Sequence, residues 1–126
     1  MKKREFSEIR RYLRKTQKQM AELLGTSIKA VQSYEQGWRD VPGHVGRQVL
    51  FFLAAKNSRH GKDRQCWEQE ECQMDMREKC PVWEFKIGNL CWFVNGTFCQ
   101  GQIQRSWQEK MKICRKCKFF QTVMTR

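Results

Sequence analysis

Seven cysteines give this 126-residue chain its clearest potential for metal or redox chemistry. Thiolates bind zinc tetrahedrally or hold a [4Fe–4S] cluster. An odd number of cysteines leaves one thiol outside any set of disulfides, and disulfides are rare in the cytoplasm, where we expect this protein. Metal binding is therefore the preferred interpretation, with structural disulfides or redox-active thiols as the alternative. The cysteines all lie in the second half of the chain, at Cys66, Cys72, Cys80, Cys91, Cys99, Cys114 and Cys117.

A [4Fe–4S] cluster is the preferred cofactor, and zinc is the alternative. Cys80 is followed by Pro81, as one ligand cysteine is in bacterial ferredoxins. The C-x2-C spacing occurs once, whereas zinc ribbons carry two such pairs. His44 and His60 lie apart from the cysteines and do not help the choice. We expect the ligands to be Cys80, Cys99, Cys114 and Cys117, with Cys66, Cys72 and Cys91 as spare thiols, a disulfide or part of a second site.

The cysteine-rich half resembles a module with two Cys-Trp pairs that occurs in sensor proteins and regulators of anaerobic bacteria. That module has no settled activity, so the resemblance implies a kind of domain rather than a function. Tryptophans in this half, at Trp67, Trp83, Trp92 and Trp107, are more often plain core residues than shields for a cluster. The resemblance is carried by Cys66-Trp67, Cys72, Cys80-Pro81, Cys91-Trp92, Gly96-Thr97, Cys99, Lys110 and Cys114-x-x-Cys117, followed by Phe119.

Residues 91–99 predict a β-hairpin, because Asn95-Gly96 is a strong turn signal between β-branched and aromatic flanks. With a two-residue turn, Trp92 lies opposite Cys99. With a three-residue turn and a glycine bulge, Cys91 lies opposite Cys99, and the two thiols could hold one metal. The turn type therefore decides whether these thiols can share a site.

A capping-box pattern, Ser106 with Glu109, predicts a helix that continues through about Arg115. Its apolar face includes Cys114, which we expect to point inward. Cys117 lies just past this helix, at a spacing that lets both thiols bind one metal.

Residues 16–37, TQKQMAELLGTSIKAVQSYEQG, predict two short amphipathic helices joined at a glycine. Thr16 and Ser27 suit the two N-caps, and Gly25 suits a left-handed turn between the helices. The pattern resembles the helix-turn-helix of the lambda-repressor/Cro-like (XRE-type) DNA-binding family. The resemblance is carried by Thr16-Gln17, Ala21, Leu24-Gly25, Val31 and Tyr34-Glu35-Gln36-Gly37.

Flanking segments complete a repressor-like bundle of four or five helices. An apolar face that includes Phe6 and Ile9 predicts a first helix over about residues 5–14. Pro42 can open a last helix, whose stripe carries Val45, Val49, Phe52 and Leu53. We therefore expect a mostly α protein with a second, small α+β domain that contains the hairpin. About 60 residues make a marginal core, so we also expect a homodimer, which suits two-fold operators.

In the XRE-type family, the third helix of the domain lies in the major groove. Lys29 would then donate to guanine O6 and N7, Gln32 would pair with adenine, and Ile28 would pack on a thymine methyl. Gln17, at the start of the preceding helix, would contact phosphate. The residues that the resemblance implies for DNA binding are Gln17, Ile28, Lys29, Gln32, Ser33, Gln36 and Arg39.

Two further positions follow from the same resemblance. Arg10 and Glu35 correspond to an ion pair inside some relatives, with ordinary surface charge as the alternative. Relatives usually carry a glycine and a hydrophobic residue just before the threonine, whereas this chain has Arg14-Lys15. We therefore expect this loop to differ, or its charge to reach phosphate.

Charge and cysteine content divide the chain into two domains. Residues 1–65 hold fifteen Lys/Arg against six Asp/Glu, and residues 66–126 hold ten against seven, so most of the net charge of +12 accompanies the helix-turn-helix. We expect domains at 1–58 and 66–126, linked by the polar segment 59–65. Excess positive charge favours double-stranded DNA as partner, and no apolar run is long enough for a membrane helix.

The sequence therefore predicts a transcription regulator whose cysteine-rich domain binds a cluster or metal and senses redox or metal state. The alternative is a DNA-binding protein in which zinc is purely structural. An enzyme is the least favoured class, because no nucleophile–base set and no phosphate-binding glycine loop is evident.

Overall fold

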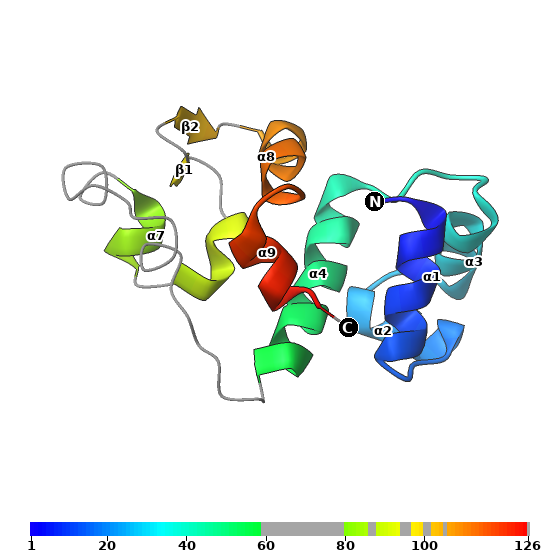
Figure 1. The fold of residues 1–126 in the computed structure, drawn as a ribbon. Coiled ribbons are helices and arrows are strands. Elements are labelled where there is room, and N and C mark those ends of the chain that lie inside the picture. Colours follow the sequence, from blue (N-terminus) through cyan, green and yellow to red (C-terminus); the bar gives the residue numbers. More distant parts are fainter. Residues whose placement is uncertain (59–79, 86–87, 94–96, 100–101, 105, 126) are drawn as a thin grey trace. The chain divides into compact units, whose positions relative to one another are not determined.

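The computed structural model describes residues 1–58, 80–85, 88–93, 97–99, 102–104 and 106–125. Over these residues the protein is mostly helical, as predicted. The chain divides into two compact units, residues 1–57 and 58–125 (Figure 1). None of the described helices is long and apolar enough to cross a bilayer.

Four helices build the first unit. Helix α3 packs against both α1 and α2, and the ring of Phe6 on α1 meets that of Tyr34 on α3 edge-on, with centroids 5.7 Å apart. Of the stripe predicted after Pro42, Phe52 alone is only half-buried. The helices are α1 (Lys3–Tyr12), α2 (Gln17–Leu24), α3 (Ile28–Gln36) and α4 (Gly43–Ser58). Their buried side chains include Phe6, Ile9, Met20, Leu24, Val31, Tyr34, Val45, Val49, Leu50 and Leu53.

Local hydrogen bonds fix both helices of the predicted motif. The Thr16 hydroxyl accepts the backbone N–H of Gln19 at 3.1 Å, and the Gln19 side-chain oxygen accepts that of Thr16 at 3.0 Å, which forms a capping box. The Ser27 hydroxyl accepts the N–H of Ala30 at 3.1 Å. Gly25 ends α2 with a φ of 65°, in the left-handed conformation. The predicted N-caps Thr16 and Ser27 and the predicted left-handed turn at Gly25 are confirmed.

The loop before α2 contains a residue in an unusual conformation. Arg14 has a φ of 59°, in the left-handed region that glycine occupies without steric cost. Arg14 therefore adopts the backbone conformation that glycine favours, in the loop where XRE-type relatives carry a glycine. A guanidinium N–H of Arg10 (Nη1) donates to the Lys15 carbonyl oxygen at 2.9 Å and ties this loop to α1.

The second unit combines short helices with a small antiparallel sheet. Its α8 contacts η1 and β2, and α7 contacts η1. Phe98 lies opposite Ile103 in the sheet, and Cys99 lies opposite Gln102. The elements are α7 (Pro81–Glu84), the 3₁₀ helix η1 (Gly88–Phe93), β1 (Thr97–Cys99), β2 (Gln102–Gln104), α8 (Trp107–Cys114) and α9 (Lys118–Val123).

The β-hairpin predicted over residues 91–99 is wrong. Residues 91–93 belong to η1, so neither predicted turn register occurs, and Asn95-Gly96 lies outside the described residues. Trp92 is fully buried, and its ring meets that of Phe120 on α9 edge-on, with centroids 6.3 Å apart. Burial of this ring outweighs the weak, context-dependent strand propensity of a short aromatic segment.

The predicted helix after Ser106 is confirmed as α8. The Ser106 hydroxyl accepts the backbone N–H of Glu109 at 3.1 Å. Cys114, at the end of α8, is buried as expected. Trp92 is a core residue of this unit, whereas Trp83 and Trp107 are half-buried.

Candidate nucleic-acid interface and thiol centre

One side of α3 is buried while the other is exposed. Ala30, Val31 and Tyr34 are buried in the core of the first unit. Residues three and four apart share a side of a helix, so the positions on the opposite side form a continuous, mostly polar stripe along α3. This α3 stripe is exposed except for half-buried Ser33, and it consists of Ile28, Lys29, Gln32, Ser33 and Gln36.

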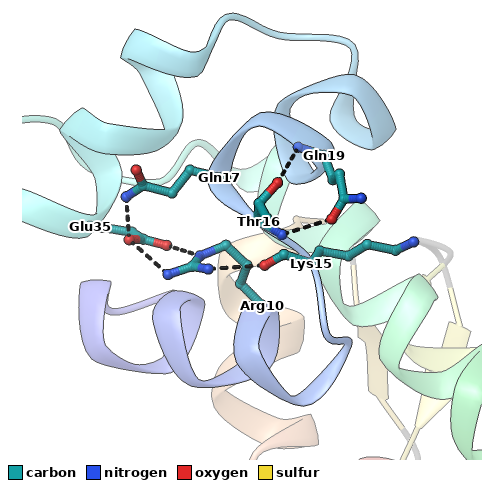
Figure 2. A network of polar contacts seen from close by, with 6 residues as sticks. All are labelled: Arg10, Lys15, Thr16, Gln17, Gln19 and Glu35. Atoms are coloured by element: carbon teal, nitrogen blue, oxygen red, sulfur yellow. Dashed lines mark hydrogen bonds and ion pairs between the residues drawn. The ribbon is translucent and has the colours of Figure 1, made fainter.

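Figure 2 shows a polar network that joins the first three helices. The guanidinium of Arg10 pairs with both carboxylate oxygens of Glu35, through Nε to Oε1 and through Nη2 to Oε2 at 3.3 Å. The amide nitrogen of Gln17 donates to Glu35 Oε2 at 2.8 Å. The side chains of Arg10 and Glu35 are only 14% and 9% exposed. The predicted ion pair is confirmed, and it is part-buried rather than ordinary surface charge.

This network orients Gln17, the predicted phosphate contact. A glutamine amide nitrogen carries two N–H groups, so one can bind Glu35 while the second reaches another acceptor. Phosphate oxygens accept hydrogen bonds, so the predicted phosphate contact would use that nitrogen. The charge of Arg10 also offsets that of Glu35, which would otherwise repel a phosphate. Arg10 and Glu35 thus hold the side chain of Gln17 in place.

Exposed aromatic and basic groups follow the end of α3. Gly37 ends the helix with a φ of 81°. Arg39 lies over the ring of Tyr34, with the guanidinium carbon 5.7 Å from the ring centroid. Trp38, which lies between Gly37 and Arg39 in the sequence, is 77% exposed. Trp38 is not among the predicted DNA contacts. Its position between a helix-ending glycine and an arginine is the sequence signal that could have predicted its exposure.

Two of the predicted metal ligands lie together. Cys80, Cys91, Cys114 and Cys117 are thiols in the structure. The backbone N–H of Cys117 donates to the Cys114 carbonyl oxygen at 2.9 Å, in the turn between α8 and α9. Both cysteines are buried, as is Cys80. Cys114 and Cys117 therefore form a fixed thiol pair.

Among the described residues, no three His, Cys, Asp or Glu side chains are placed to hold a metal. Cys80 is thus not a third ligand beside the thiol pair in this structure. Cys66, Cys72 and the side chain of Cys99 lie outside the described part. The four-cysteine ligand set remains a prediction.

A buried lysine lies on the same helix as the thiol pair. Lys110 is one helical turn before Cys114 and is 1% exposed. Burial raises the pKa of the Cys114 thiol, and nearby Lys110 opposes that rise, as Arg115 does, while Cys117 adds to it. The sequence signal for this lysine is its spacing of four residues from a cysteine on the inner face.

Comparison with protein families, with curated proteins and with solved structures finds no match to this chain.

Proposed function

We propose that this protein is a transcription regulator that binds double-stranded DNA, as a homodimer, through the α3 stripe. The observation that carries the proposal is the division of α3 into a buried apolar side and the exposed, mostly polar α3 stripe. An α-helix fits the major groove, where base edges differ in their hydrogen-bonding groups. Lys29 and Gln32 offer the donors and acceptors that read guanine and adenine there.

Charge and the polar network support the same proposal. The first 65 residues carry most of the excess positive charge, which attracts a phosphate backbone. Gln17, held by Glu35, lies at the start of α2, where unpaired backbone amides favour a phosphate. Arg39, an exposed residue just beyond the end of α3, adds a positive charge next to the α3 stripe in the sequence. Phosphate contacts would position the domain, and the α3 stripe would read the bases.

We further propose that the second unit holds a thiolate metal centre that senses redox or metal state. A [4Fe–4S] cluster is preferred, and zinc is the alternative. The chemistry of the thiol pair fits either group, because both are ligated by buried cysteine thiolates. Loss or exchange of the metal would change the packing around Cys114 and Cys117 and so bias the DNA-binding state.

Purely structural zinc is the second candidate for this centre. Cys114 and Cys117 are both buried in a small unit, as ligands of a structural site are. Such a metal stabilises the fold without responding to a signal.

Two substitutions test the DNA assignment. Lys29→Ala should weaken binding to selected operator DNA by about 1–3 kcal/mol and relax specificity at one base pair, because it removes a base contact. Gln17→Ala should weaken binding to all sequences evenly, because it removes a phosphate contact. Binding is measured by fluorescence anisotropy with operator fragments selected from genomic DNA.

Lys118→Ala, an exposed lysine of the second unit, is the control for the loss of one charge. It should leave the affinity almost unchanged. The DNA assignment is wrong if neither Lys29→Ala nor Gln17→Ala alters retention on genomic fragments.

A further inference from the structure

Trp38 is the most exposed large apolar side chain among the residues that the structure describes, at 77%. Tryptophan is highly buried on average, because removal of its large ring from water is favourable. It is also enriched at interfaces, where the ring packs on apolar surface and the indole N–H donates a hydrogen bond. An exposed tryptophan in a fixed loop is therefore suited to contact a partner.

Hydrogen bonds to the last turn of α3 fix the backbone of this loop. The backbone N–H groups of Trp38 and Arg39 both donate to the Ser33 carbonyl oxygen, at 3.0 and 3.3 Å. Gly37 ends the helix in the left-handed conformation. The backbone of Trp38 is thus held next to the α3 stripe, whose last residue is Gln36.

A lysine of α1 lies against the same loop. A carbon placed on the Gly37 Cα in the position of a Cβ would be 3.0 Å from Lys3 Cδ and 3.3 Å from Lys3 Nζ. Lys3 is exposed and begins α1, so its ammonium group comes from a different helix than Trp38. The absence of a side chain at Gly37 makes room for this approach.

The charge around Trp38 is positive because of Lys3. The loop itself carries one cation, Arg39, and one carboxylate, Asp40, both exposed, and their charges cancel. Lys3 adds a positive charge beside Gly37. An exposed indole flanked by two cations matches a phosphate, which accepts hydrogen bonds and is negative.

The length of α3 places this loop at the edge of a major groove. Nine residues at about 1.5 Å each make a helix of about 13 Å, close to the width of the major groove, about 12 Å. Recognition helices contact base edges mainly through their first turns. With Lys29 over the bases, the end of α3 therefore meets the sugar-phosphate backbone.

We propose that Trp38 and Lys3 bind the sugar-phosphate backbone of double-stranded DNA beside the groove that the α3 stripe occupies. The indole N–H of Trp38 donates to a phosphate while its ring packs on the adjacent sugar, and Lys3 neutralises a phosphate. This inference rests on the DNA-binding function proposed above, and it adds α1 and the loop after α3 to the contact surface.

The test measures binding of full-length variants by fluorescence anisotropy to selected operator DNA and to an unrelated duplex of the same length. Trp38→Ala should weaken binding to both duplexes by the same factor, about tenfold, because a backbone contact carries no sequence information. Trp38→Phe keeps a ring but lacks the N–H donor, and should lose less. Phe85→Ala removes a ring that is 66% exposed in the second unit, and should change affinity by less than about twofold.

The salt dependence of binding separates the role of Lys3 from that of Trp38. Lys3→Met should reduce the slope of log affinity against log salt concentration by about one, because one phosphate contact is lost. Trp38→Ala should leave that slope unchanged, since no charge is removed. Lys118→Met removes an exposed lysine of the second unit and should also leave the slope unchanged.

An affinity of Trp38→Ala within about twofold of wild type, with Lys29→Ala weakened as expected, would overturn this inference and leave the DNA assignment intact. A loss confined to operator DNA would also overturn it, because Trp38 would then contact bases. Loss of the dimer in Trp38→Ala, measured by analytical ultracentrifugation, would assign Trp38 to a contact between copies instead.

Wild-type affinity of Trp38→Phe would overturn the phosphate hydrogen bond, and an unchanged salt slope in Lys3→Met would overturn the role of Lys3. Should Trp38→Ala lose its helical circular dichroism, Trp38→Gln takes its place with the same expected result. The inference fails together with the DNA assignment if Lys29→Ala, Gln17→Ala and Trp38→Ala all bind as wild type does.

Discussion

At the scale of single residues, the clearest feature is the shared use of Glu35. Its carboxylate accepts hydrogen bonds from the guanidinium of Arg10 and the amide of Gln17, so α1, α2 and α3 are joined at one charged group. Removal of one partner from a part-buried ion pair leaves the other charge poorly solvated, which costs more than the pair contributes. The network therefore links stability of the first unit to the orientation of its proposed phosphate contact.

Arg10→Met should lower the free energy of unfolding by about 3 kcal/mol, because it leaves the Glu35 carboxylate part-buried without its ion pair. Addition of Glu35→Gln should recover part of that loss, because it removes the uncompensated charge. Urea unfolding followed by circular dichroism measures both values. Arg4→Met breaks the exposed Arg4–Glu8 pair instead and should cost less than about 0.5 kcal/mol. Equal losses for Arg10→Met and Arg4→Met would contradict this account.

At the scale of elements, capping and turn residues define the first unit. Thr16, Gly25 and Ser27 each act within their own helix end, so the bounds of α2 and α3 could be predicted from local sequence. Arg14 is the exception, since its left-handed backbone is held by hydrogen bonds between the loop and α1 rather than by its own preference.

Arg14→Gly should raise the free energy of unfolding by about 0.5–1 kcal/mol, because glycine adopts the left-handed conformation without steric strain. Arg14→Ala is the matched control: it removes the same side chain and charge but keeps the strain, and should change stability by less than about 0.5 kcal/mol. Thermal and urea unfolding provide the measurements. The strain at Arg14 would be disproved by identical stabilities of the glycine and alanine variants.

Prediction succeeded less well for the elements of the second unit. The helix α8 follows from its cap and its apolar spacing, as the first helices do. Residues 91–93 were predicted to lie in a strand but belong to η1. The buried ring of Trp92 packs there against Phe120 of α9, which is distant in the sequence. A short aromatic segment has no preference strong enough to resist such a contact.

At the scale of the whole molecule, one chain carries a basic unit, which we propose binds DNA, and a thiol-bearing unit. A sensor requires that the state of the second unit change the DNA affinity of the first. A structural zinc site requires only that the second unit fold. These two functions predict different effects of metal removal.

Protein purified without oxygen should show a broad absorbance at about 400 nm that bleaches in air, the signature of a cluster. Bleaching should change operator affinity by at least about fivefold, measured by anisotropy on the same sample before and after exposure. A zinc-substituted sample provides the control, because it is insensitive to brief exposure to air. Colourless protein with bound zinc, whose removal unfolds the second unit without altering DNA affinity, would support the structural alternative instead.

The sequence by itself determined the features that depend on neighbours within one or two helical turns. These are the helices of the first unit, the caps of α2 and α3, the exposed α3 stripe and the closeness of Cys114 to Cys117. The Arg10–Glu35 pair was predicted from the family resemblance, not from local pattern.

Tertiary structure alone decided which groups far apart in the chain share a buried environment. Gln17 meets Glu35 through the crossing of α2 and α3, and Trp92 meets Phe120 through the packing of η1 on α9. Lys110 is buried on α8, a helix that contacts η1 and β2. The physical reason is that burial and ion pairing depend on the sum of all packed elements, whereas caps and periodicity act within one element.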